Sequence, residues 1–120
     1  MKLQTDTPLP KGFESVERFV DDWALDTTTV RLAKRCTSDL ADITEFYDAM
    51  RPIAVGALDY LRQYQLGAIP PEGQRLMRLM LMLQEVAPAV EWYGDPIGTD
   101  CYDYRRVKIA VEIPDVGAQA

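Results

Sequence analysis

The chain has 120 residues, the length of a single domain, and its hydrophobic fraction of 48% and charged fraction of 27% are those of a globular protein rather than a disordered one. Acidic residues outnumber basic ones by 19 to 13, and the net charge of -6 argues against nucleic-acid binding through a broad basic face. The sequence contains no histidine, which excludes a Ser-His-Asp triad, a His-ligated haem and the common His-bearing zinc and di-iron sites.

The first part of the chain is predicted to be an extended lead-in followed by a helix. Residues 1–11 are mostly polar, and they lack the apolar run of a signal peptide. A helix is then predicted over residues 13–25, because apolar residues recur there at helical spacing. These residues are Phe13, Val16, Phe19, Val20 and Trp23.

A second, shorter helix is expected after Asp26 and Thr27, which are both good N-cap residues. Its predicted buried residues are Val30, Leu32 and Ala33.

The third predicted helix carries the clearest pattern in the sequence. Ser38 is expected to cap it, and it is expected to run to about residue 66. Its apolar residues alternate at spacings of three and four: Leu40, Ile43, Tyr47, Met50, Ala54, Ala57 and Leu61, with Phe46 and Leu58 widening the seam. Pro52 stands in the middle and removes a backbone donor, so the segment is either one kinked helix or two helices. The unbroken seam favours one kinked helix.

A fourth helix is predicted over residues 71–93. Pro71 suits its first position, Pro88 should kink it, and Gly94 should end it. Its apolar seam alternates at spacings of three and four: Leu76, Leu79, Leu83, Val86, Val90 and Tyr93.

The fourth helix is also rich in methionine, and residues 76–83 are apolar at every position except Arg78. A helix in a small bundle needs only one apolar stripe, so this segment is either covered inside the domain or meets another chain. We favour a subunit interface formed by Met77, Met80 and Leu81.

The C-terminal arm and tail, residues 107–120, are predicted to begin with a strand over residues 107–113. Val107, Ile109 and Val111 alternate with other side chains, which is a strand pattern. A single strand leaves its backbone groups unpaired, so the arm is expected to dock on a neighbouring chain or in a groove. A disordered tail is the alternative.

Aromatic and charged residues near the end of the fourth helix suggest a candidate ligand pocket. Tyr93 lies at the predicted helix end, and Tyr102, Asp103 and Arg105 follow in the next segment. Such residues can bind an aromatic or carboxylate ligand, although they can equally close one end of a bundle.

Two acidic groups are interpreted as solvent-facing helix surfaces rather than metal sites. The first contains Asp21, Asp22 and Asp26, and the second contains Asp39, Asp42, Glu45 and Asp48. The two cysteines, Cys36 and Cys101, are far apart in sequence. Reduced thiols in a cytoplasmic protein are favoured over a disulfide.

Together these patterns predict one all-α domain over residues 1–120: a small bundle of four main helices, with an extended C-terminal arm. The favoured function is a protein-interaction or accessory protein that self-associates through the methionine-rich helix. The alternative is a small ligand-binding or catalytic bundle that uses the pocket near Tyr93, Tyr102 and Arg105. No residue is assigned a catalytic or metal-binding role, no cofactor is expected, and no stretch is long and apolar enough to span a membrane.

Overall fold

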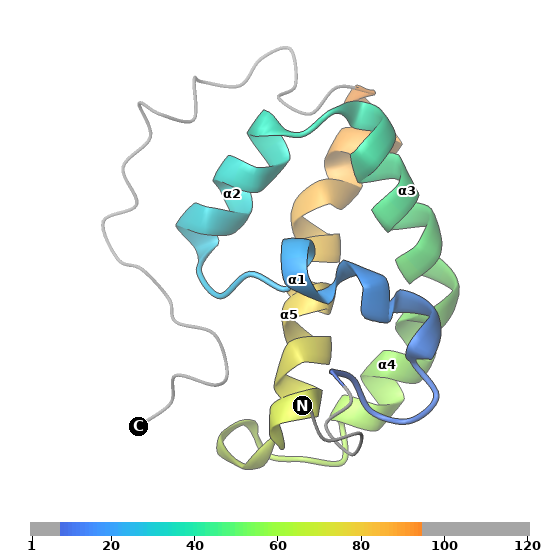
Figure 1. Ribbon diagram of the computed structural model, residues 1–120, viewed down its shortest axis with the longest axis vertical. Helices are drawn as coiled ribbons and strands as arrows, with labels where there is room; N and C mark the ends of the chain where they lie inside the picture. The colour runs from blue at the N-terminus through green and yellow to red at the C-terminus, as the bar shows by residue number, and fades with distance from the viewer. Residues whose placement is uncertain (1–7, 95–120) are drawn as a thin grey trace, which may run out of the picture.

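The computed structural model describes residues 8–94, which form a set of packed helices with no strand in that range (Figure 1). The predicted all-α class is confirmed for this part of the chain. The predicted C-terminal arm, residues 107–120, and most of the extended lead-in lie outside the described residues.

The first helical segment is not one regular α-helix. A 3-10 helix, η1 (Glu14–Phe19), leads into one turn of α-helix, α1 (Val20–Trp23). Phe13, Val16 and Phe19 are buried and recur every three residues, which is the period of a 3-10 helix. The prediction of a helical segment here is correct. The 3-10 type was not predicted, although a spacing of three residues is typical of it.

The second helix, α2 (Thr28–Thr37), begins as predicted at Thr27, whose hydroxyl accepts a hydrogen bond from the Val30 backbone N–H at 3.2 Å. The predicted buried face is wrong at Val30, which is 43% exposed. Arg31 is buried instead, and its guanidinium donates to the Leu25 carbonyl at 2.8 Å. That hydrogen bond satisfies a carbonyl in the α1–α2 connection.

The predicted third helix is interrupted where Pro52 lies. An α-helix, α3 (Leu40–Met50), passes into a 3-10 turn, η2 (Arg51–Ile53), and then into a second α-helix, α4 (Ala54–Leu61). Pro52 cannot donate the α-helical hydrogen bond, so the break falls where the residue requires it. Ser38 does not cap α3; its hydroxyl donates to the Lys34 carbonyl at the end of α2.

A 3-10 turn, η3 (Leu66–Ala68), leads to the longest helix, α5 (Pro71–Pro88). Pro71 occupies its first position, as predicted. After Pro88 the backbone forms a π-helical turn, η4 (Ala89–Tyr93). The predicted stop at Gly94 is confirmed: this residue adopts a left-handed conformation with φ of 62°, and its N–H donates to the Ala89 carbonyl at 2.8 Å.

Helix α5 is the centre of the fold. It contacts α1, α2, α3 and α4, and Figure 1 shows it between α2 on one side and α3 and α4 on the other, with α1 crossing in front. Its side chains include Leu76, Leu79, Met82 and Val86, which are fully buried. A half-buried ion pair of 2.8 Å between Arg35 and Glu85 ties α2 to it.

No helix among residues 8–94 is long and apolar enough to cross a membrane.

Candidate functional site

Three of the four residues predicted to form an aromatic and arginine-lined pocket lie outside the described residues: Tyr102, Asp103 and Arg105. The fourth, Tyr93, is the last residue of the π turn η4. Ligand binding at this set therefore stays a prediction.

The methionine-rich segment lies in α5, where most of its side chains are covered by the same chain. Met80 is 7% exposed, and Met77 is half-buried against the core. Leu81 is also half-buried. The helices packed around α5 therefore cover much of the apolar surface that predicted an interface. The other predicted interface residues, Val107, Ile109 and Val111, lie outside the described residues.

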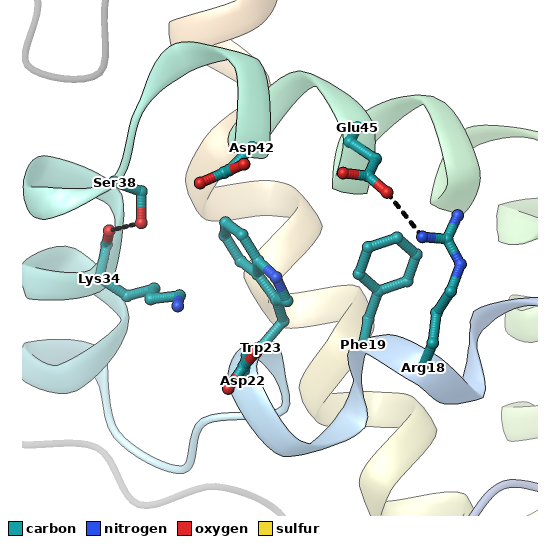
Figure 2. A pocket seen from close by; sticks show the side chains of 8 residues that line it. All are labelled: Arg18, Phe19, Asp22, Trp23, Lys34, Ser38, Asp42 and Glu45. Carbon is teal, nitrogen blue, oxygen red and sulfur yellow. Dashed lines mark hydrogen bonds and ion pairs between the residues drawn. The ribbon is translucent and has the colours of Figure 1, made fainter.

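An open cleft of about 380 Å³ lies between the N-terminal helical segment, α2 and α3 (Figure 2). Its volume is within the range of small-molecule sites. Arg18, Phe19, Asp22 and Trp23 line it from η1 and α1, Lys34 and Ser38 from α2 and its end, and Asp42 and Glu45 from α3.

The indole of Trp23 lies between a ring and a cation. One interaction is a stack with Phe46, with ring centroids 4.7 Å apart and planes only 9° from parallel. The other places the Lys34 ammonium 4.6 Å from the indole centroid, which is cation–π distance. Because Phe46 is fully buried, this stack anchors the cleft to the core.

A salt bridge crosses the cleft at its other end. Arg18 donates to the Glu45 carboxylate at 2.7 Å, and its guanidinium also lies 4.2 Å from the centroid of the Phe19 ring. Both charged side chains are more than half exposed, so the pair contributes about 0–1 kcal/mol to stability. Its main effect is to hold two long side chains along one edge of the cleft.

The charges of the cleft favour a cation over an anion. Three carboxylates and two cationic groups line it, and one of the cations is already paired with a carboxylate. Asp22 and Asp42 stand on opposite sides of Trp23 in Figure 2. The Trp23 and Phe19 rings already carry Lys34 and Arg18, so a small organic cation would be held by the carboxylates Asp22 and Asp42 rather than by a ring face.

The sequence alone did not predict this cleft. Asp22, Asp42 and Glu45 were interpreted as parts of two separate acidic surfaces. They meet only because η1, α1, α2 and α3 pack together, and no local spacing indicates that arrangement. The one local signal was aromatic: Phe19 and Trp23 are four residues apart, so both lie on one side of the first helical segment.

A second candidate surface runs along the outer side of α3, η2 and α4. We call it the outward stripe, and it comprises Asp48, Arg51, Pro52, Val55, Leu58, Asp59 and Arg62, all of which are exposed. At its centre Val55 is 72% exposed and Leu58 is 47% exposed. The prediction that Leu58 widens the buried seam is therefore wrong.

Two tyrosines in the same half of the chain have perturbed acidity. The Tyr47 hydroxyl donates to the Glu91 carboxylate, which ties α3 to η4 and raises the pKa of Tyr47. Burial and, to a smaller extent, a hydrogen bond with Tyr64 raise the pKa of Tyr60. Both effects favour the protonated phenol in the folded protein.

The described residues offer little for metal chemistry: within residues 8–94, no group of three or more Cys, Asp or Glu side chains is arranged to hold a metal ion. The candidate sites are thus a charged cleft with an aromatic floor and an exposed apolar stripe with charged ends. Comparisons of this chain with protein-family models, with curated proteins and with solved structures find no match.

Proposed function

We propose that this chain is a small helical protein-interaction protein that self-associates through the outward stripe. The observation that carries the proposal is that α4 has apolar residues on two opposite sides. Ala57 and Leu61 are buried in the core, whereas Val55 and Leu58 are 72% and 47% exposed on the other side. A helix at the surface of a monomer needs only one apolar face.

The arrangement of the stripe resembles a small protein interface. Single exposed apolar residues are normal, but Val55 and Leu58 are one turn apart and therefore adjacent. Exposed Pro52 extends the apolar centre by another turn. Charged residues stand at both ends, as in the polar rim that surrounds the apolar centre of most interfaces.

The proposal places the interface on α4 rather than on the methionine-rich α5. Met80 has its partners inside the chain, so a charge introduced there would unfold the core rather than test an interface. Val55 offers a cleaner test, because it lies outside the core.

Sedimentation velocity across the micromolar range, up to about 1 mM, tests the proposal. We expect the mean mass of the parent to rise above the monomer mass of 13.6 kDa with concentration. Val55→Asp should remain monomeric, because an unpaired charge would have to be desolvated in the apolar centre. Val30→Asp is the matched control, since it places the same charge at another exposed valine, on α2.

A parent that keeps the monomer mass at every concentration would refute self-association. Equal association of Val55→Asp and the parent would show that the contact lies elsewhere.

The cleft supports a second candidate function, which is binding of a small organic cation. Agmatine is a suitable probe, and Trp23 reports on the cleft by fluorescence once the exposed Trp92 is replaced by Phe. We expect agmatine at up to about 1 mM to change the emission of Trp92→Phe, because a cation drawn to Asp22 and Asp42 would displace Lys34 from the Trp23 ring. Asp22→Asn with Asp42→Asn should weaken the response. An unchanged spectrum would exclude this function.

A further inference from the structure

We propose that Lys34 is an intramolecular ligand of the cleft: its ammonium occupies the cation position on the Trp23 ring, and this position accepts a quaternary ammonium once Lys34 leaves it or loses its charge. The inference rests on the second candidate function, binding of an organic cation in the cleft. It adds the class of cation that the ring selects and the residue that controls access to the ring.

The Trp23 ring is fixed in place and covered by its neighbours. Phe46 is fully buried and stacks on the indole with planes 9° from parallel, so the core holds the ring in one orientation. Trp23 lines an open cleft, yet it is only 6% exposed. The side chains that cover the ring therefore determine whether a ligand can reach it.

Lys34 covers the ring without any stronger contact of its own. Figure 2 shows its side chain extending from α2 toward Trp23, where the ammonium lies 4.6 Å from the indole centroid. Within residues 8–94 this ammonium forms no ion pair and donates no hydrogen bond. A single cation–π contact at a solvent-accessible position is weak, so Lys34 can leave the ring easily.

The other cation of the cleft is held more firmly. Arg18 lies 4.2 Å from the centroid of the Phe19 ring, and it also donates to the Glu45 carboxylate at 2.7 Å. Displacing Arg18 would break both interactions. Lys34 is therefore the cation that gives way.

The departure of Lys34 leaves the cleft better suited to a cation. The three carboxylates of the cleft then face one cationic group, Arg18, which is already paired with Glu45. Asp22 and Asp42 have no ion-pair partner in the described part of the chain. The negative charge thus rises beside the ring face that Lys34 uncovers, and both changes favour an incoming cation.

The ring selects a quaternary ammonium. Such a cation has no N–H, so it cannot donate a hydrogen bond to a carboxylate, and an aromatic face is a strong attraction that remains open to it. A primary ammonium or a guanidinium can instead be held by Asp22 and Asp42 through charged hydrogen bonds. Tetramethylammonium therefore probes the ring, and agmatine probes the carboxylates.

Nuclear magnetic resonance of the unmodified protein tests the displacement of Lys34. The indole shields the methylene protons next to the Lys34 ammonium, and this ring-current shift should disappear as agmatine binds. The Arg18 methylene protons next to its guanidinium, over the Phe19 ring, are the internal control and should keep their shift.

Replacement of Lys34 tests its control of the ring. In the Trp92→Phe background, tetramethylammonium chloride is exchanged for sodium chloride at constant ionic strength while Trp23 emission is followed. Lys34→Met keeps an unbranched side chain without the charge, and the dissociation constant should fall at least about tenfold. Lys34→Arg keeps a cation on the ring and should bind as weakly as the parent. Lys11→Met removes the same charge at an exposed residue that does not line the cleft, and it should also match the parent.

The outcomes separate this inference from the candidate function. If agmatine binds the parent but the Lys34 signals stay unchanged, or if Lys34→Met binds tetramethylammonium no better than Lys34→Arg, the inference is overturned and cation binding stands. If tetramethylammonium binds Lys34→Met while agmatine fails to bind the parent, Lys34 closes the cleft, and only the candidate function of the parent is overturned. If neither cation binds any form, both are overturned.

Discussion

Replacing Phe46 by Ala should cost more stability than most single changes in this protein. The Phe46 side chain is fully buried. Its ring stacks on Trp23 with the ring centroids 4.7 Å apart, and it makes an edge-to-face contact with Phe19 with the centroids 5.4 Å apart. Truncating a buried Phe to Ala costs about 3–5 kcal/mol through lost burial and the cavity left behind. The two ring pairs contribute about 0.5–1.5 kcal/mol each beyond burial, so we expect the upper part of that range.

A loss of this size is large against the total stability of a domain, which is typically about 5–15 kcal/mol. Urea unfolding followed by far-ultraviolet circular dichroism measures it directly. Phe46→Leu is the matched variant, since it keeps most of the apolar volume but removes the ring contacts, and it should cost about 1–2.5 kcal/mol.

A double-mutant cycle then isolates one ring contact. Phe19→Leu combined with Phe46→Leu should show a coupling energy of about 0.5–1.5 kcal/mol. If Phe46→Ala unfolds within about 1 kcal/mol of the parent, the floor of the cleft is not packed as described, and the reasoning is refuted.

Three further predictions concern packing and ionisation. Leu83→Ala should cost about 2–5 kcal/mol in urea unfolding, because Leu83 lies in the core on α5; a parent-like midpoint would contradict this. Gly73→Ala should destabilise the protein by about 1–2 kcal/mol despite the higher helix propensity of Ala, because the added Cβ would lie 2.8 Å from the Ile69 side chain. A higher melting temperature of this variant would show that Ile69 moves freely. The unfolding free energy should fall as pH rises above about 10. The hydrogen bond to Glu91 raises the pKa of Tyr47 in the folded protein. The stabilisation from this hydrogen bond is therefore complete below the pKa of Tyr47 in the unfolded chain, and it is lost as pH rises through the higher pKa of the folded protein. Tyr47→Phe should show a shallower alkaline decline, and an identical decline would argue against the hydrogen bond.

The periodicity of apolar residues, together with Pro and Gly at helix boundaries, predicted most of the helical architecture. The alternation of three and four from Ile43 to Leu61 identified the core side of α3 and α4. Pro71 and Gly94 marked the two ends of the last helical segment because each acts through its own backbone. Signals of this kind are local, so a single sequence is sufficient to read them.

The predictions that failed depend on contacts between distant segments. Arg31 is buried because the carbonyl of Leu25 needs a donor, and nothing in the local pattern indicates this. Leu58 stands beside the apolar seam in sequence but lies on the outside, because the seam residues Ala57 and Leu61 alone are sufficient to cover the core side of α4. The cleft combines residues from several elements, so its composition emerges only after packing.

The central position of α5 also determines when this chain can fold during its synthesis. All of α1 to α4 precede α5 in the sequence, and each of them packs against it. While only residues up to about 70 have left the ribosome, those helices lack the element that covers their apolar sides, and short isolated helices are marginal in water. The core can therefore close only when residues 71–88 emerge. Until then the apolar sides of α3 and α4 lack the helix that covers them, and we expect the nascent chain to be prone to chaperone binding at that stage of translation.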